Sequence, residues 1–405
     1  MGAGHRDPAR AKALLIASAW VNQIGNFLTF TAVVVQAQVQ HGSSFSALVL
    51  LAQSVPALLA ARSISQRVPA HRTRQVWIGA QVALAALNVA LIPLHDGRGA
   101  LLVFVALTML LRAVANPLFY AVLGQERDED RRRATLTAVG AAGSFALVIS
   151  PAAGGAVLAG SGMVVVLALD ALTYLLAVVL FAAAAGVSGT PAAAGAAPAG
   201  SSGSGASGPG RVRVVNVLGA FQSPVPGGSR AHPALLGWVV LIALGAVLNA
   251  VQTPASFTLF AFSEADFGVV LASFGAGGVA VFALSAFSDR VRVPLVAAAA
   301  LLAAGLVLWA LDASLVLSCA GFALAGFGSA AATGALRADM AVAAERAAVP
   351  VLSLWSWANQ VVLAANLVLY GVFAALFAAG VPAVVGLVAL VLLAVVLVAV
   401  AVARA

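Results

Sequence analysis

Long runs of apolar residues fill most of the chain, and the short segments between them hold nearly all of its charge. The runs lack the alternation of membrane β-strands, and most approach the ~20 residues that a helix needs to cross a bilayer. Twelve runs are found, at roughly 13–37, 45–64, 75–94, 100–123, 134–159, 162–186, 234–260, 266–287, 293–311, 313–336, 350–378 and 380–403. The pattern predicts an all-α polytopic membrane protein with twelve transmembrane helices.

A segment of small and polar residues divides these runs into two sets of six. Residues 190–210 are almost all Ala, Gly, Ser and Pro, a composition that cannot bury enough apolar surface to fold. Residues 211–221 form either a short helix on the membrane surface or more disordered chain. We expect an N-terminal six-helix bundle, a flexible cytoplasmic linker and a C-terminal six-helix bundle, over 1–186, 187–232 and 233–405.

Charge fixes the expected orientation. Only 8% of the residues are charged, against about 25% in a soluble domain. The net charge of +8 does not indicate a nucleic-acid partner, because it is unevenly distributed. With the N-terminus inside, nineteen basic and eight acidic residues lie in cytoplasmic segments, against one basic and four acidic residues outside. This positive-inside pattern predicts a multi-pass protein of the inner membrane with both termini in the cytoplasm. We also expect the protein to be a monomer.

The two halves are weakly similar in sequence. The segment Ser-Ala-Phe-Ser-Asp-Arg-Val-Arg-Val-Pro, which starts at Ser285, matches Arg-Ser-Ile-Ser-Gln-Arg-Val-Pro, which starts at Arg62. The same offset aligns Asn26 with Asn249. Parallel six-helix repeats with a substrate site between them are a known plan of secondary transporters.

At these motifs the chain resembles the major facilitator superfamily, and in particular its bacterial drug–proton antiporters near the siderophore and macrolide exporters. The family carries Gly-x-x-x-Asp-Arg between its second and third spans. The second-half copy keeps Asp289 and Arg290, whereas the first-half copy has Gln66 where the aspartate belongs. The resemblance implies that Asp289 and Arg290 latch one gating state, while the plain alternative is that they are solvated loop charges that set topology.

Two further family motifs lie within the spans. An arginine in the fourth span is matched by Arg112, and the fifth-span Gly-Pro-x-x-Gly-Gly is matched by Ser150-Pro151-Ala-Ala-Gly154-Gly155. The resemblance associates the second motif with antiporters. Physically, small residues let helices approach closely, and Pro151 removes a helix hydrogen bond and favours a kink.

Two ionisable side chains lie well inside the predicted bilayer, Arg112 and Asp170. Such residues are costly in lipid and mark functional sites by default. Arg112 either organises a proton or substrate site or bonds helix carbonyls. Asp170 either carries the proton or caps structure in a span that the family plan makes peripheral. Relatives often have an acid where this chain has Asn26, so proton coupling depends on Asp170, another acid, or is absent.

Uncharged polar side chains follow helical stripes in several spans, of which the first and seventh line the central cavity in the family plan. They point to substrate contact, with helix–helix hydrogen bonding as the alternative. The candidate substrate residues are Asn22, Asn26 and Thr29 in the first span, Asn249, Gln252 and Thr253 in the seventh, and Asn359 in the eleventh.

No enzyme, cofactor or metal motif is found in the sequence, which contains a single cysteine, Cys319. We therefore expect a secondary transporter that exports a small amphipathic or apolar compound in exchange for protons. The alternatives are an uncoupled or differently coupled facilitator, or a receptor or assembly protein that keeps the fold without transporting.

Overall fold

The computed structural model describes residues 8–65, 68–123, 129–188, 233–287, 293–311, 314–349 and 351–403, and its regular structure in these ranges is helical. The first half contains α1 (Pro8–His41), α2 (Ser43–Ser65), η1 (Ala70–Arg72), α3 (Thr73–Leu91), η2 (Ile92–Leu94), α4 (Arg98–Leu123) and α5 (Glu129–Ser188). The second half contains α7 (Pro233–Thr258), α8 (Glu264–Phe287), α9 (Leu295–Leu311), α10 (Leu315–Arg346), α11 (Val351–Ala378) and α12 (Ala383–Val402).

The 60-residue α5 supplies two of the predicted spans. It breaks at Gly162, which has φ 77° and ψ 175°. Glycine tolerates this positive φ because it has no Cβ. We call residues 129–161 the first arm of α5 and residues 163–188 the second arm.

The helices of the structure account for all twelve predicted membrane spans. In the part of the chain that the structure describes, nine helices are long and apolar enough to cross a membrane, and α5 is one of them. Its two arms, together with α2 and the 17-residue α9, complete the twelve. The largest difference from the sequence prediction is α10, which continues to Arg346 instead of ending near 336. The linker predicted over 187–232 lies almost wholly outside the described residues and stays a prediction.

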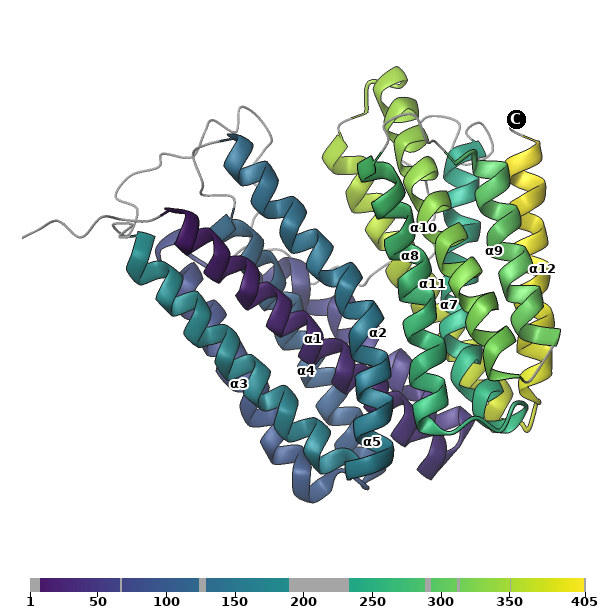
Figure 1. Ribbon diagram of the computed structural model, residues 1–405, viewed down its shortest axis with the longest axis horizontal. Coiled ribbons are helices and arrows are strands. Elements are labelled where there is room, and N and C mark those ends of the chain that lie inside the picture. The colour runs from purple at the N-terminus through teal and green to yellow at the C-terminus, as the bar shows by residue number, and fades with distance from the viewer. Residues whose placement is uncertain are drawn as a thin grey trace, which may run out of the picture.

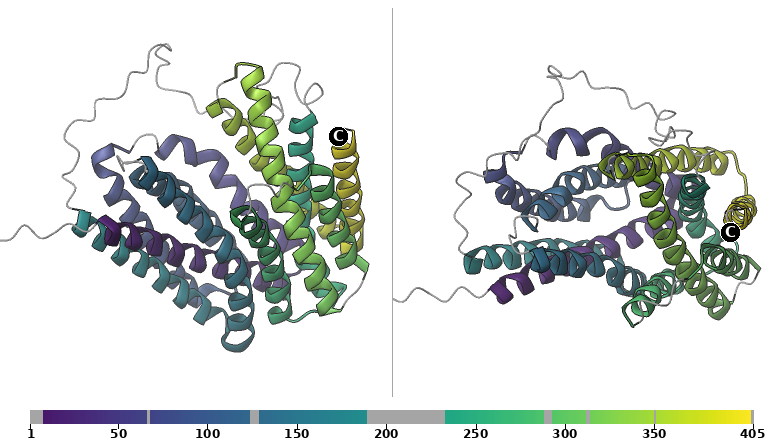
Figure 2. Two further views of the ribbon diagram at one scale, coloured as in Figure 1. Left: turned by 45° about the horizontal axis from the view of Figure 1, so that its top comes forward. Right: turned by 90° about the horizontal axis from the view of Figure 1, so that it is seen from above.

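The helices form two groups that converge at one end and diverge at the other (Figure 1). The first arm of α5 packs on α8, and α2 packs on α11. We call the converging end, which carries the α7–α8 connection, the closed end, and the other the open end. The C-terminal end of α12 lies at the open end, and the same two groups are seen from two other sides in Figure 2.

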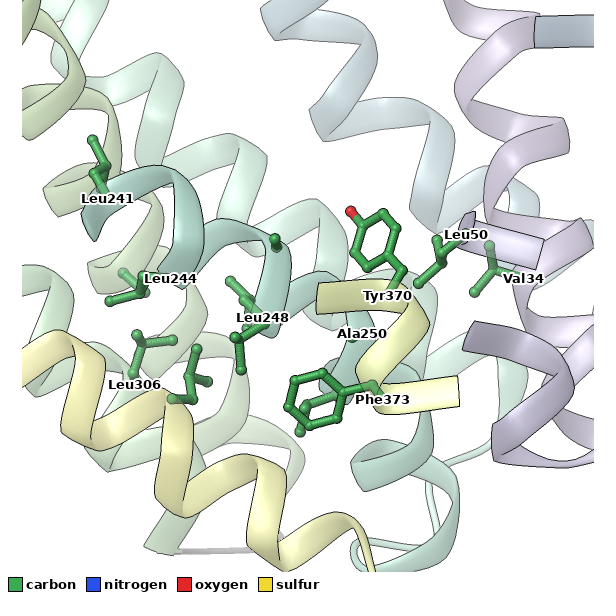
Figure 3. Close-up of a cluster of buried hydrophobic side chains, with 14 of the residues drawn as sticks. Val34, Leu50, Leu241, Leu244, Leu248, Ala250, Leu306, Tyr370 and Phe373 are labelled. Atoms are coloured by element: carbon green, nitrogen blue, oxygen red, sulfur yellow. The ribbon is translucent and has the colours of Figure 1, made fainter. Parts of the chain in front are cut away.

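Apolar side chains from both halves meet in one continuous core. Leu241, Leu244 and Leu248 of α7 are buried in the second half together with Leu306 of α9 (Figure 3). The same cluster includes Tyr370 and Phe373 of α11 and, from the first half, Val34 and Leu50. The two halves therefore share buried apolar surface as well as backbone contacts.

Candidate functional site

A hydrogen-bonded group of three polar side chains lies inside the N-terminal bundle. Arg112 on α4 donates from Nε and Nη2 to the hydroxyl of Tyr174, at 3.2 and 2.7 Å. Tyr174, on the second arm of α5, is fully buried and donates to Asn26 Oδ1 on α1 at 2.7 Å. The intramembrane arginine thus connects three helices through one phenol.

Asp170 lies one turn from Tyr174 and is 0% exposed. The Thr173 hydroxyl is 3.2 Å from its Oδ1 and 2.8 Å from its backbone oxygen. Thr29 on α1 and Asn88 on α3 also lie beside the carboxyl group. Neither Asp170 Oδ2 nor Thr29 Oγ1 has a hydrogen bond of good geometry. The carboxyl group is therefore sealed among neutral polar groups and incompletely bonded.

Arg112 is close enough to Asp170 for electrostatic interaction, yet it binds Tyr174 instead. Among the described residues the salt bridge within 4 Å is that of His95 and Asp96, which involves neither Arg112 nor Asp170. Arg112 and Asp170 thus share one polar region without forming a direct ion pair.

Gly25 explains how Asp170 comes so close to α1. A Cβ on Gly25 would collide with Thr173 Oγ1 and Asp170 Oδ1 and would lie 3.0 Å from Thr173 Cβ. Only a glycine leaves room there for the second arm of α5, which follows the general use of small residues at membrane helix contacts.

Two small cavities lie in the N-terminal bundle, and the smaller one adjoins this cluster. One of about 20 Å³ is lined by Thr29, Gln53, Thr108 and Arg112, among others. Another, of about 50 Å³, is lined by polar groups that include Asn22, whose Oδ1 is buried without a partner. Both have room for water, which requires roughly 10–15 Å³ and two or more polar partners.

The predicted substrate residues of the second half lie in different surroundings. Asn249 on α7 is exposed, accepts a hydrogen bond from Gln252 at 3.2 Å and lies next to the Tyr370 hydroxyl. Thr253 is fully buried and its hydroxyl has no partner. Asn359 on α11 is exposed. Asn249 and Asn359 are thus the accessible members of this set.

The sequence-aligned pair Asn26 and Asn249 is not placed alike. Asn26 is 9% exposed and turned toward Tyr174, whereas Asn249 is exposed. The prediction that both face one substrate cavity stays a prediction, and in this structure Asn26 belongs to the polar group around Arg112.

The neighbouring glycines of the fifth-span motif pack on different partners. A Cβ on Gly154 would lie 3.0 Å from the Leu28 oxygen of α1, inside the N-terminal bundle. A Cβ on Gly155 would collide with the Glu264 oxygen of α8, in the other half. The helix continues through Pro151, whose oxygen would lie 2.5 Å from a Cβ on Gly268. The motif therefore joins α5 to its own half and to the other half at adjacent positions.

Some expectations fall elsewhere. Asp289, Arg290 and Gln66 lie outside the described residues.

A larger cavity of about 940 Å³ lies near the open ends of α8 and α10, with Arg337 and Asp339 in its mostly apolar lining. None of the predicted site residues lines this cavity. Within the described ranges, no cluster of three His, Cys, Asp or Glu residues is suited to hold a metal ion.

Sequence reasoning missed Tyr174 and Asn88. Tyr174 stands four residues after Asp170, which places both on one face of a helix, and this spacing was the available signal. Asn88 of α3 likewise lies beside the Asp170 carboxyl group.

Neither a protein-family model nor a curated protein matches the sequence. Solved structures do. A bacterial homologue of the iron transporter ferroportin, in an inward-facing state, has 13% identity and a TM-score of 0.69, with 97% of this chain and 99% of that chain covered. A POT family transporter in complex with 5-aminolevulinic acid has 12% identity and a TM-score of 0.65, covering 100% and 96%.

A bacterial homologue of the human lysosomal transporter Spinster, inward-facing and unoccupied, has 15% identity and a TM-score of 0.63, with 96% of each chain covered. Matches of this extent at such low identity define the fold. The chain is an all-helical polytopic membrane protein with the major facilitator fold, as the sequence predicted. It shares this fold with the transporters named above.

Proposed function

We propose that the chain is a secondary active transporter that exports a small amphipathic or apolar compound in exchange for protons. The two halves would alternately expose a site between them to the two sides of the membrane. The observation that carries the proposal is the buried Asp170, which lies beside the Arg112–Tyr174–Asn26 group. Intramembrane acids facing a bundle interior commonly mark ion pathways.

The substrate class follows from the polar groups that remain accessible. Asn249 and Asn359 are exposed amides on helices of the second half. Amides offer hydrogen bonds without a fixed charge, which suits neutral or weakly basic molecules. The matched transporters are named for iron, 5-aminolevulinic acid and other cargo, so the fold does not select among substrates.

Asp170→Asn tests the coupling. The purified full chain is placed in liposomes with an imposed pH gradient, and movement of two amphipathic fluorescent dyes is followed, the neutral Nile red and the weakly basic Hoechst 33342. We expect Asp170→Asn to abolish gradient-driven accumulation while it spares equilibrative dye exchange, because asparagine keeps the shape but cannot titrate. The control is Glu345→Gln, which neutralises an exposed acid near the end of α10.

The outcomes separate the candidate functions. Accumulation that persists in Asp170→Asn would contradict proton carriage by Asp170 and favour a differently coupled or uncoupled facilitator. Wild-type protein that moves none of the dyes under any gradient would contradict the proposed substrate class.

A further inference from the structure

The Tyr174 hydroxyl has a full set of hydrogen bonds. It donates one, to Asn26 Oδ1 at 2.7 Å, and it accepts two, from Arg112 Nε at 3.2 Å and Nη2 at 2.7 Å. A hydroxyl has a single proton and two lone pairs. No bonding capacity is left for Asp170, although it lies on the next turn of the same helix.

Asp170 is correspondingly short of partners. Its Oδ1 is 3.2 Å from the Thr173 hydroxyl, and its Oδ2 has none. An ionised carboxyl group is costly to bury unless a charged partner or a full set of hydrogen bonds compensates it. Two events would relieve that cost, namely a proton on the carboxyl group or the approach of the Arg112 guanidinium, which has five N–H donors and uses two on Tyr174.

We infer that Tyr174 is a positioning residue of the proton site: it holds Arg112 away from Asp170 while Asp170 carries a proton, and Arg112 turns to Asp170 when the proton leaves. The inference rests on the proposed proton coupling. The O–H bond of the carboxyl group is the bond that breaks, and the proton leaves as solvated H⁺. The guanidinium keeps its charge and exchanges a phenol for a carboxylate as its acceptor.

The surroundings of Asp170 permit this exchange. Asp170 and Tyr174 are four residues apart, so they are separated by about 6 Å along the helix, a distance that the long arginine side chain can bridge by rotation. The groups that face the carboxyl group are Thr29 of α1, Asn88 of α3, Arg112 of α4 and, from its own helix, Thr173 and Tyr174. Within the described residues, Arg112 is thus the charged side chain that interacts with Asp170.

The experiment follows the protonation of Asp170 directly. In the full chain in lipid nanodiscs, the infrared band of the protonated Asp170 carboxyl group is identified by its loss in Asp170→Asn and is titrated with pH. We expect Tyr174→Phe to lower the midpoint by about 1–2 pH units, because Arg112 no longer gives up its charge-assisted hydrogen bonds to the phenol when it turns to the ionised Asp170. Adding Arg112→Gln to Tyr174→Phe should remove that shift.

The matched control is Tyr120→Phe, which deletes the hydroxyl of a tyrosine on α4 that is 47% exposed. It should leave the midpoint unchanged. An unchanged midpoint in Tyr174→Phe would overturn the inference. If Tyr174→Phe does not fold, Asn26→Ala replaces it, because this change removes the acceptor that orients the Tyr174 hydroxyl. The inference requires Asn26→Ala to lower the midpoint as well. An unchanged midpoint in Asn26→Ala would overturn the inference.

Failure of the proposed function looks different. A wild-type Asp170 band that does not titrate between about pH 5 and 9 would contradict proton carriage itself, since a carrier must load and unload in that range. A band that titrates in the wild type but is insensitive to Tyr174 would leave proton coupling intact and reject only the role of Tyr174.

Discussion

Substitution of Gly155 by alanine should open the closed end of the molecule. In the structure, a Cβ at this position would collide with the Glu264 backbone oxygen and would lie 3.1 Å from Gly268 Cα and 3.3 Å from the Glu264 carbonyl carbon. All three atoms belong to the backbone of α8, which cannot yield as a side-chain tip does. Ordinary contacts between carbon atoms are at about 3.5–4.0 Å, so the two helices must separate by roughly 0.5 Å or more.

The size of the effect follows from the cost of overpacking. An extra methyl group in a close-packed contact costs about 1–3 kcal/mol. Here the cost falls only on conformations in which α5 touches α8, because the three atoms nearest to that Cβ all belong to the other half. The equilibrium should therefore shift away from the closed-end contact by roughly 5- to 150-fold.

Spin-label distances measure the shift. Cys319 is first replaced by alanine so that only the introduced cysteines carry labels. The labels are placed at Arg98 and Ala379, which are exposed and lie at the closed-end termini of α4 and α11. Their distance reports the separation of the two halves. Gly155→Ala should add a longer-distance population. The control is Gly160→Ala in the same arm, where a Cβ meets nothing within 4 Å. Identical distance distributions for the two variants would refute the argument that Gly155 sets the closure of this end.

Two further substitutions test the placement of the polar residues. Asn249→Leu should weaken substrate binding by about 0.5–1.5 kcal/mol, which is measured as a several-fold rise in the half-saturating dye concentration at unchanged protein level. Equal loss of transport for all dyes, together with loss of folded protein, would instead make Asn249 a helix contact. Gly25→Ala should lower the free energy of unfolding by about 1–3 kcal/mol, because the added methyl group collides with Thr173 and Asp170. The control is Gly79→Ala, whose added Cβ has nothing within 4 Å and which should stabilise its helix. If both variants stabilise the detergent-solubilised chain in thermal unfolding, α1 has room for a side chain at Gly25.

The membrane spans could be predicted because their signal is local. A run of apolar residues predicts a membrane span without reference to any other part of the chain, and the lone Arg112 indicates a polar interior. The boundaries were less certain where composition changes gradually. Thus α10 continues past 336 through a segment that contains Arg337, Asp339 and Glu345, since charges at the end of a long helix can lie outside the bilayer.

The partners within the site could not be predicted in the same way. Tyr174 is one aromatic residue among many in apolar helices, and only the packing of α1 against the second arm of α5 turns its hydroxyl toward Asn26. The similar sequence positions of Asn26 and Asn249 were a poor guide for the same reason. Asn26 has an arginine-bound phenol beside it, and Asn249 has Gln252 and the Tyr370 hydroxyl.

The glycines connect the proposed proton site to the contact between the halves. Gly25 of α1 lies against Asp170, and Leu28, one turn further along α1, lies against Gly154. The next residue, Gly155, touches α8. A shift of α1 by a fraction of an ångström at Asp170 would therefore reach the closed-end contact through direct backbone packing, because close-packed contacts without compressible side chains transmit displacement. Such contiguous packing is the physical requirement for coupling between two sites, and it predicts that Asp170→Asn and Gly155→Ala have non-additive effects on the spin-label distances.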